Sequence, residues 1–531
     1  MNAKKCTLIF TIFALLLGAC GPTEVVKTIT VTQEVQVAGM PVVQEVQVQS
    51  QPQYVVATAV AVMPAPTQVM AIPGTIPTPV DNYFQDYGIN PFVDATEDNL
   101  STFALDVDTA SYSVARRYVN DGNLPPADAV RVEEFVNYFE MGYPTPPEIA
   151  FGIYADGAPS PFTNDGTYLL RIGIQGYQVP ESERHSSILT FVIDVSGSMG
   201  QENRLGLVQR SLELLVNRLR PDDQVSIVVY GSNARVVLNP TRGDQRSTIL
   251  DAIYSLYPED STNAEAGLRL GYQLALQAFQ PGANNRVILC SDGVANVGVT
   301  NPDVIMEEVR GYVSEGVYLT TVGFGMGNFN DVLMEQLADN GNGNYAYVDT
   351  LDEAQDLFVN DLTATLQVIA RDARVQVDFN PDVVARYRLI GYENRAIADQ
   401  DFRNDSVDAG EIGAGHSATA LYAVQFQPGA QGRIATVQLR WEDPTTYEVR
   451  EINGNINTWD MSPSFASADS RYQVAVLAAQ YAETLRQSPY AAGTTFYQIY
   501  TLALPLLDTL GEDPDVSEFV SLVGRASQIA R

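Results

Sequence analysis

The sequence predicts an α/β protein: a doubly wound, mostly parallel sheet inserted into a β-sandwich-like domain, with flanking helical segments. Between about 186 and 362, apolar runs alternate with amphipathic helical patterns, which is typical of a parallel sheet covered on both faces. Beyond 371 the hydrophobic period changes to two, which indicates half-buried strands. Two further strand-like runs, "FGIYADG" (151–157) and "TYLLRIGIQG" (167–176), precede the α/β part.

Residues 1–20 carry a targeting signal. Lys4 and Lys5 precede an apolar stretch that ends in "LGAC" at Cys20. A basic region, a short apolar region and small residues before the cleavage position indicate a secretory signal that is too short for a stable span. The "LGAC" ending resembles a bacterial lipobox, which implies lipidation of Cys20. An ordinary signal peptide with an incidental cysteine is the alternative. We therefore expect an extracytoplasmic protein, lipid-anchored in the cell membrane or outer membrane.

Residues 21–80 are expected to be a disordered tether. Val, Thr, Gln and Pro dominate this segment, and "QEVQV" occurs at 33–37 and again at 44–48. Aromatic residues are almost absent, so the segment has little from which to build a core. The Pro-rich end favours an extended spacer, although the Val/Thr alternation leaves transient strands as an alternative.

Residues 81–185 should hold two short helices before the two strands. "DVDTASYSVARRYVNDG" (106–122) reads as a helix capped by Asp108 or Thr109, and "DAVRVEEFVNYF" (128–139) reads as a second helix. Adjacent positions on a helix point in different directions. Glu133 and Glu134 are therefore expected to be solvated.

The α/β part should span 186–362. Its first strand, "SILTFVIDV", is followed by a helix with Leu205, Val208 and Leu212 on one face. Further strands are expected at "QVSIVVYG", the edge strand "ARVVLNP", "RVILCSDG", "VYLTTVGFG" and "YAYVD". Further helices are expected at 245–256, 264–278, 302–314, 329–339 and 351–370.

Residues 363–455 should form the β-sandwich-like domain and residues 456–531 a helical region. The strands at 151–176 need partners, because two strands alone are marginally stable. We expect them to join the strands at 373–450 in one β-domain, which makes the α/β domain an insertion.

The charge and the residue composition argue against several classes of function. Net charge is −33, and no lysine follows Lys27, so nucleic acid and anionic lipid headgroups would be repelled. Cys290 ends an apolar run and is expected to be a buried structural thiol. His185 and His416 are the two histidines, and neither has a suitable nucleophile near it in the sequence. We therefore expect no enzyme activity, with a metal-dependent hydrolase or a structural scaffold in envelope assembly as alternatives.

Three loops should meet at the carboxyl edge of the predicted sheet. The first strand ends in "DVSGS", with Asp194, Ser196 and Ser198; the other loops carry Thr262 and Asp292. Two carboxylates and three hydroxyls, without nitrogen or sulfur, suit a hard cation such as Mg²⁺, Mn²⁺ or Ca²⁺. A lone DxSxS is weak, because Ser and Asp are common helix caps. Together with Thr262 and Asp292 in the loops of an α/β pattern, DxSxS is a strong signal for a cation site.

With these residues, 186–362 resembles the von Willebrand factor type A (VWA) domain, which has a Rossmann-like fold and a metal-ion-dependent adhesion site (MIDAS). The resemblance implies direct ligation by Ser196, Ser198 and Thr262, with Asp194 and Asp292 acting through water. Mg²⁺ is the expected ion. "NPFVDATEDNLSTFALDVDTASYSVARRYVNDG" and "GMGNFNDVLMEQLADNGNGNYAYVDTLDEA" extend the likeness to a family of bacterial lipoproteins built around this domain. It implies protein binding or adhesion, with a partner's Asp or Glu as the outside ligand.

The lipid anchor can be tested with one substitution. Cys20→Ser should release the protein from the membrane fraction or stop its maturation, because no thiol remains to carry the lipid. Fractionation of cells expressing the wild type and the variant is the measurement. Unchanged fractionation would contradict the lipobox.

Overall fold

The computed structural model describes residues 29–37, 40–48 and 82–530, with gaps at 148–149, 181, 260–261, 294–301, 327–328 and 361–365. The chain divides into two compact units, residues 1–75 and 76–531. The expected signal segment, Cys20 and most of the expected tether lie outside the described residues. Within the described part of the chain, no helix combines the length and the hydropathy needed to cross a bilayer.

The first unit contains an antiparallel hairpin, β1 (Ile29–Val37) and β2 (Met40–Val48). The register places Gln33 opposite Gln44 and Val37 opposite Met40, so the two "QEVQV" repeats meet only at their first residues. This differs from the disordered tether expected for 21–80. The cause is the period-two alternation of β-branched residues, which favours strands where the Pro-rich composition further along does not.

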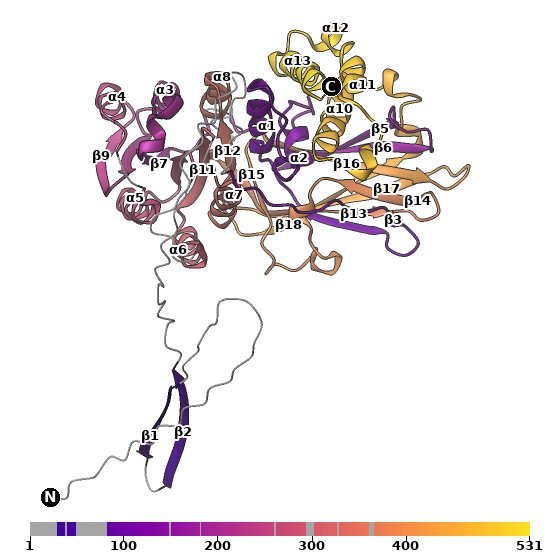
Figure 1. Ribbon diagram of the computed structural model, residues 1–531. Helices are drawn as coiled ribbons and strands as arrows, with labels where there is room; N and C mark the ends of the chain where they lie inside the picture. Colours follow the sequence, from indigo (N-terminus) through magenta and orange to yellow (C-terminus); the bar gives the residue numbers. More distant parts are fainter. Residues whose placement is uncertain are drawn as a thin grey trace, which may run out of the picture. The chain divides into compact units, whose positions relative to one another are not determined.

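The α/β domain of the second unit contains a six-stranded sheet (Figure 1). Its first five strands are parallel and the edge strand β9 is antiparallel, which confirms the predicted mostly parallel sheet. In spatial order the strands are β12 (Tyr345–Val348), β11 (Tyr318–Phe324), β10 (Asn284–Ser291), β7 (Ser187–Asp194), β8 (Gln224–Tyr230) and β9 (Ala234–Arg242).

Helices cover both faces of this sheet. One apolar core joins Val192 and Leu289 to α5, α6 and α7, and a second joins Phe191 and Ile193 to α3 and α4, so the sheet is doubly wound. The helices are α3 (Arg204–Val216), α4 (Arg246–Tyr254), α5 (Ala264–Ala278), α6 (Pro302–Ser314), α7 (Asp331–Asn340) and α8 (Leu351–Gln355).

The last helix of this domain is shorter than the predicted 351–370. After α8 the chain makes a π-helical turn, η3 (Asp356–Asn360), and it is in strand β13 from Val368. Pairing of "VIARDARVQVDF" with neighbouring strands overrides the local helical pattern, because strand residues gain their stability from tertiary partners.

Two five-stranded sheets form the β-domain and enclose an apolar core. Strand β6, which precedes the α/β domain, pairs along its length with β16, which follows it, so the prediction of an inserted α/β domain is confirmed. One sheet contains β15 (Gly410–Gly413), β13 (Val368–Phe379), β17 (Arg433–Glu442) and β18 (Val449–Asn457), with β4 (Leu100–Ala104) on β13. The other contains β3 (Val93–Asp94), β14 (Val384–Ile390), β16 (Ser417–Phe426), β6 (Thr167–Gly176) and β5 (Phe151–Pro159).

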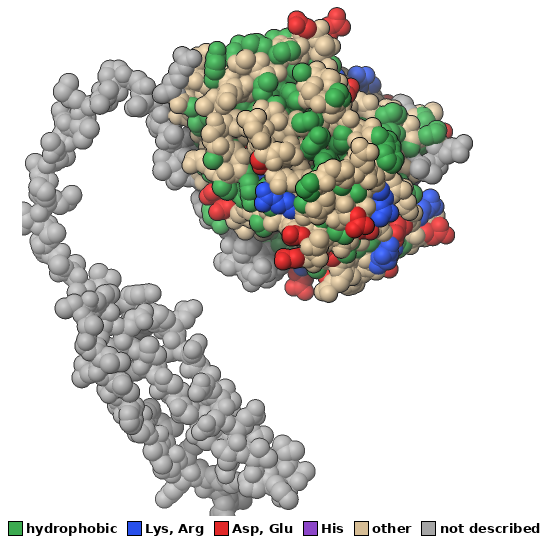
Figure 2. Space-filling model, turned by 90° about the vertical axis from the view of Figure 1, so that its right-hand side faces the viewer, with side chains coloured by type: hydrophobic (Ala, Val, Ile, Leu, Met, Phe, Trp, Pro, Cys, Tyr) green, Lys and Arg blue, Asp and Glu red, His purple; other side chains and the backbone are tan. Residues whose placement is uncertain are grey.

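Helices from the two ends of the folded chain pack together on the outer face of the second sheet (Figure 1). They share one apolar core that includes Leu169 of β6 and Leu421 of β16. Figure 2 shows hydrophobic side chains gathered over the upper part of one face, with acidic and basic side chains below. The helices are α1 (Ala110–Asn120), α2 (Val132–Asn137), α10 (Ser470–Leu485), α11 (Phe496–Ala503), α12 (Leu506–Leu510) and α13 (Pro514–Ile529).

Several acidic residues expected on the surface are buried. Glu133 and Glu134 are both buried, because α2 packs against α10 and lies at the junction of the domains. Asp108 does not cap α1: the cap position is Thr109, and the Asp108 carboxylate accepts a 2.9 Å hydrogen bond from the backbone N–H of Tyr345. The expectation that Glu133 and Glu134 are solvated was wrong, because the neighbours that cover them are distant in sequence, whereas Thr109, one of the two expected caps, holds the cap position of α1.

Arg116 should be essential for stability. Its guanidinium contacts Asp349 at 2.5 Å, Glu353 at 2.6 Å and Glu518 at 3.0 Å. Arg116→Met leaves Asp349 and Glu353 buried without their cation, so the free energy of unfolding should fall by about 3–5 kcal/mol. Chemical denaturation is the measurement. Arg242→Met is the control, because Arg242 is 58% exposed in its pair with Asp244, and it should cost less than about 1 kcal/mol.

Candidate metal-binding site

The site lies at the carboxyl edge of two central strands. Strands β7 and β10 are parallel neighbours, with Ile193 opposite Cys290. Asp194 is the last residue of β7, Ser291 is the last residue of β10, and Asp292 follows it. The two loops therefore leave the sheet side by side, at the edge where α/β folds bind ligands.

Hydrogen bonds fix the orientation of Asp194, whose side chain is fully buried. One carboxylate oxygen accepts from the backbone N–H of Ser196 at 2.8 Å. The other accepts from the hydroxyl of Ser291 at 3.0 Å. Ser291 was not among the residues predicted from the sequence. Its signal was its place at the end of a strand beside "DVSGS".

The two predicted serines come together in the loop after β7. Their hydroxyl oxygens lie 3.0 Å apart, with Ser196 buried and Ser198 half-buried at the start of η2 (Gly197–Asn203). Gly200 allows a close approach: a Cβ there would lie 3.2 Å from Pro258. The serine loop therefore touches the loop that leads to Thr262.

Thr262 occupies the predicted position directly before α5. It is half-buried, and the next residue, Asn263, caps the helix by accepting a 3.1 Å hydrogen bond from the N–H of Ala266. Among the described contacts, none joins the Thr262 hydroxyl to the other four predicted ligands. The structure thus brings Asp194, Ser196 and Ser198 together by contact and places Thr262 on the adjoining loop.

Asp292 is paired with an arginine that the sequence analysis missed. Arg204, the first residue of α3, donates a 2.6 Å hydrogen bond from Nη1 to Asp292, and both side chains are buried. Its Nη2 donates to the carbonyl of Met326. Gly325 gives the arginine room, since it has a φ of +84° and a Cβ would lie 2.4 Å from the Arg204 side chain. No spacing in the sequence connects residues 88 positions apart.

The electrostatics of the site favour a cation. Burial, followed by repulsion from Asp292, raises the pKa of Asp194 to about 6. Burial, followed by the neighbouring Asp194, holds the pKa of Tyr230 well above its usual value. A positive ion beside these oxygens would relieve both effects.

The donor set also fits a hard ion. The gathered side chains offer oxygen alone, from hydroxyls and carboxylates, as Mg²⁺ and Ca²⁺ require. In the part of the chain that the structure describes, no three His, Cys, Asp or Glu side chains gather closely enough to hold a metal by themselves. Ser196, Ser198 and Thr262 are the hydroxyl groups that would complete such a donor set.

Comparisons with known proteins agree with this architecture. Residues 189–360 match the family described as "von Willebrand factor type A domain", residues 78–171 match "von Willebrand factor", and residues 364–529 match "Uncharacterized protein YfbK, C-terminal". The Escherichia coli (strain K12) protein described as "Uncharacterized protein YfbK" is 38% identical over 475 residues, covering 84% of this chain and 81% of that protein. The chain belongs to the YfbK family.

More distant relatives share parts of the YfbK-family chain. The protein sll0103 of Synechocystis is 25% identical over 314 residues, covering 57% of this chain and 71% of its own length. Inter-alpha-trypsin inhibitor heavy chain H2 of Sus scrofa is 31% identical over 160 residues, which are 29% of this chain and 17% of that protein. The solved structure titled "von Willebrand factor type A from Catenulispora acidiphila" is 15% identical, with a TM-score of 0.42 and coverage of 71% of this chain and 90% of its own.

The cysteine and the two histidines of this YfbK-family protein are not part of the oxygen donor set. Cys290 is fully buried among apolar residues, as predicted for a structural thiol, and burial raises the pKa of its thiol above the usual range. His185 is exposed before β7. His416 lies in a turn of the β-domain, where burial lowers its pKa to about 4. The absence of enzyme activity stays a prediction.

The Arg204–Asp292 pair can be tested without any partner. Arg204→Met leaves two buried carboxylates with no cation, so in chelator the free energy of unfolding should fall by about 3–5 kcal/mol. Mg²⁺ should then raise the melting midpoint of the variant more than that of the wild type, because the ion replaces the lost charge. Differential scanning calorimetry gives both values.

Arg269→Met is the matched control, since Arg269 pairs with Glu265 and Glu308 on the exposed surface of the same domain. It should change stability by less than about 1 kcal/mol. Equal stability of Arg204→Met and wild type in chelator would argue against a functional role for the buried pair.

Proposed function

We propose that this protein is a lipid-anchored extracytoplasmic binding protein whose VWA domain holds a divalent cation. Through that ion it binds an Asp or Glu of a protein partner. The observation that carries the proposal is the buried cluster of Asp194, Ser196 and Ser198 at the carboxyl edge of the sheet, made of oxygen atoms alone. The lipid anchor rests on "LGAC" and is part of the same proposal.

Each residue has a role toward the ion. Ser196, Ser198 and Thr262 would ligate through their hydroxyls, and Asp194 and Asp292 would act through bound water. Mg²⁺ suits this set best, with Mn²⁺ or Ca²⁺ as alternatives. The ion supplies an electrophilic position for an anionic oxygen from outside. Arg204 donates a 2.6 Å hydrogen bond to the Asp292 carboxylate, which favours the water-mediated role of Asp292 over direct ligation.

Binding fits this arrangement better than hydrolysis. Neutral hydroxyl ligands cancel little of the ion's charge, so an incoming carboxylate is attracted strongly. The carboxylate nearest the serines, Asp194, accepts two hydrogen bonds and is buried. Those contacts use its oxygens to hold the loops, whereas a general base would need a free oxygen facing a bound water.

The negative charge of the protein affects how an acidic partner could bind. With a net charge of −33, the protein repels an acidic partner at long range. Recognition of an acidic residue must therefore come from the ion at short range. Binding should consequently depend on the metal more than on ionic strength.

Metal binding can be measured by calorimetry with Mg²⁺ and Mn²⁺. Thr262→Ala and Asp194→Asn should each weaken binding about tenfold or more, because each removes a ligand or the group that orients one. Thr262 lies on a loop and Asp194 is the last residue of β7, where Asn is an isosteric replacement, so the fold should remain. Ser314→Ala is the control, since its exposed hydroxyl bonds a carbonyl within α6. Equal metal affinity in all four proteins would refute the site.

A partner screen then tests the function. Wild-type protein should capture a specific envelope protein in Mg²⁺ and lose it in chelator. Thr262→Ala should capture none in either buffer. Capture that is unaffected by chelator and by Thr262→Ala would show that the cation is not the recognition element.

A further inference from the structure

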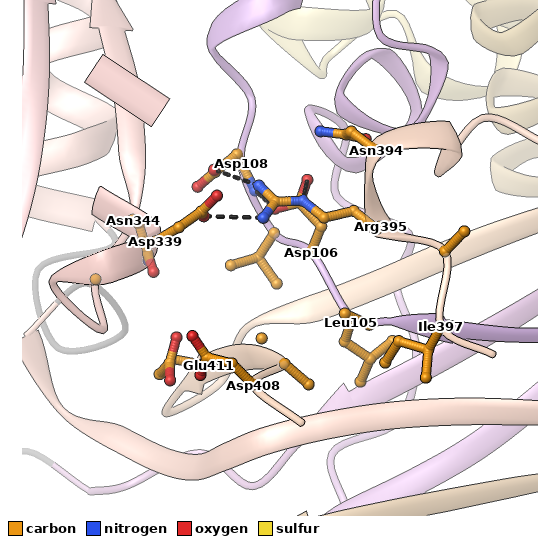
Figure 3. A pocket seen from close by; sticks show the side chains of 16 residues that line it. Leu105, Asp106, Asp108, Asp339, Asn344, Asn394, Arg395, Ile397, Asp408 and Glu411 are labelled. Carbon is orange, nitrogen blue, oxygen red and sulfur yellow. Dashed lines mark hydrogen bonds and ion pairs between the residues drawn. The ribbon is translucent and has the colours of Figure 1, made fainter. Parts of the chain in front are cut away.

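The junction between the two domains holds more buried acid than base. Arg395 illustrates this: it contacts Asp339 at 2.8 Å, Asp106 and Glu335 at 3.3 Å, and Asp108 at 3.4 Å. Figure 3 shows Asp108 and Asp339 pointing toward its guanidinium group. Arg395 is thus shared by four carboxylates, three of them buried and one, Asp339, partly exposed.

A pocket of about 260 Å³ opens beside this junction. Its walls come from residues 85–89 and five residues between 127 and 133 of the N-terminal segment, from Glu393 and Asn394 of η4 (Glu393–Arg395) and from Arg486 after α10. The volume is far above the roughly 10–15 Å³ that one water needs. The pocket can therefore accept a small organic group.

Glu133 in the wall of this pocket has an unused oxygen. Its side chain is 1% exposed, and its Oε2 accepts a 2.8 Å hydrogen bond from the backbone N–H of Tyr392. Its Oε1 accepts no hydrogen bond within the described part of the chain. Burial, followed by repulsion from Glu393, raises the pKa of Glu133 to about 7. A buried acceptor without a donor is costly, and most such groups in proteins have a partner.

The two arginines in the wall are engaged with other carboxylates. Arg131 contacts Glu134, and it contacts Asp331 at 2.5 Å. Arg486 contacts Glu483, and it contacts Glu393 at 3.0 Å. Among the described ion pairs, none involves Glu133. The pocket's own cations therefore do not meet the need of this carboxylate.

The remaining polar side chains of the pocket include acceptors in Asp86, Asp128 and Asn394, while Gln85 and Tyr87 can both donate and accept. Asn394 donates its amide to Glu335 at 2.7 Å, which leaves its carbonyl oxygen available. Asp86 and Asp128 line the pocket and are exposed, so they place negative charge near its mouth. The arrangement calls for a guest with several donors and positive charge.

We propose that this pocket binds the primary ammonium group of an alkylamine, with Glu133 as its principal partner. An ammonium offers three N–H donors, and Glu133, Glu393 and Asn394 in the pocket wall carry oxygen acceptors. A bare metal is a poorer guest, since no described cluster of acidic residues could ligate one. The chain has no lysine after Lys27 to fill the pocket from its own folded part. The amine comes from a free diamine or from a partner's lysine side chain.

Calorimetry of the full-length protein in chelator tests the proposal, and the chelator separates it from the proposed metal site. The probes are 1,4-diaminobutane, Nα-acetyl-lysine methylamide and the neutral isostere 1-butanol. Both amines or either one should bind, and 1-butanol should not. Binding by the lysine derivative alone assigns the pocket to a partner's side chain, and binding by the diamine alone assigns it to a free amine.

Glu133→Gln should weaken amine binding about tenfold or more, since it replaces a charged acceptor with a neutral amide. Asp408→Asn is the matched control: Asp408 lines the neighbouring pocket of Figure 3, and amine affinity should not change. If Glu133→Gln does not fold by circular dichroism, Glu393→Gln takes its place with the same expectation. Absence of binding by both amines, or equal affinity in wild type and the glutamine variant, overturns the proposal.

Discussion

Buried arginines shared among carboxylates hold the inserted α/β domain against the rest of the protein. Arg131 joins the N-terminal segment to α7 through Asp331, and Arg116 joins α1 to the end of β12 through Asp349. Replacing such pairs by apolar residues is often neutral in free energy, whereas leaving one partner unpaired is costly. The contacts therefore specify how the domains meet more than they add net stability, and apolar cores supply most of the stability on either side.

The same contacts also determine where the edge with the proposed metal site lies. The chain enters the α/β domain at the amino end of β7, directly from the β-domain, and the site lies at the other end of that strand. The two ends, Ser187 and Asp194, are seven residues apart, which is about 23 Å along a strand. Along the same carboxyl edge, β12 lies three strands from β7, or about 14 Å, and there Arg116 holds Asp349. The proposed partner would therefore approach the end of β7 that is far from the chain's entry into the domain, at the edge where α1 also lies.

The parts of this architecture that local patterns determine could be predicted from the sequence. The alternation of buried strands and amphipathic helices predicted the sheet. Two short strands that needed partners predicted the insertion, and "DVSGS" predicted three residues of the site. Interactions between distant segments could not be predicted. Glu134 has the pattern of a solvated helix residue, yet it is buried and paired with Arg131, which also contacts Asp331, 200 residues away; Asp292 lies 88 residues from Arg204. Which buried charges neutralise each other depends on the tertiary fold, and it cannot be predicted from local periodicity.

Arg204 makes the charge of the proposed metal site suit an acidic partner. Asp194 and Asp292 carry two negative charges, and Arg204 cancels one of them at 2.6 Å. A divalent cation then leaves the site with one net positive charge, which one partner carboxylate neutralises. Without the arginine, cation and carboxylates would already balance, and a second acid would bring uncompensated negative charge into a buried region. The arginine thus lowers the affinity of the proposed site for the ion and raises the affinity of the bound ion for an anionic ligand. Such a site favours recognition over permanent metal storage.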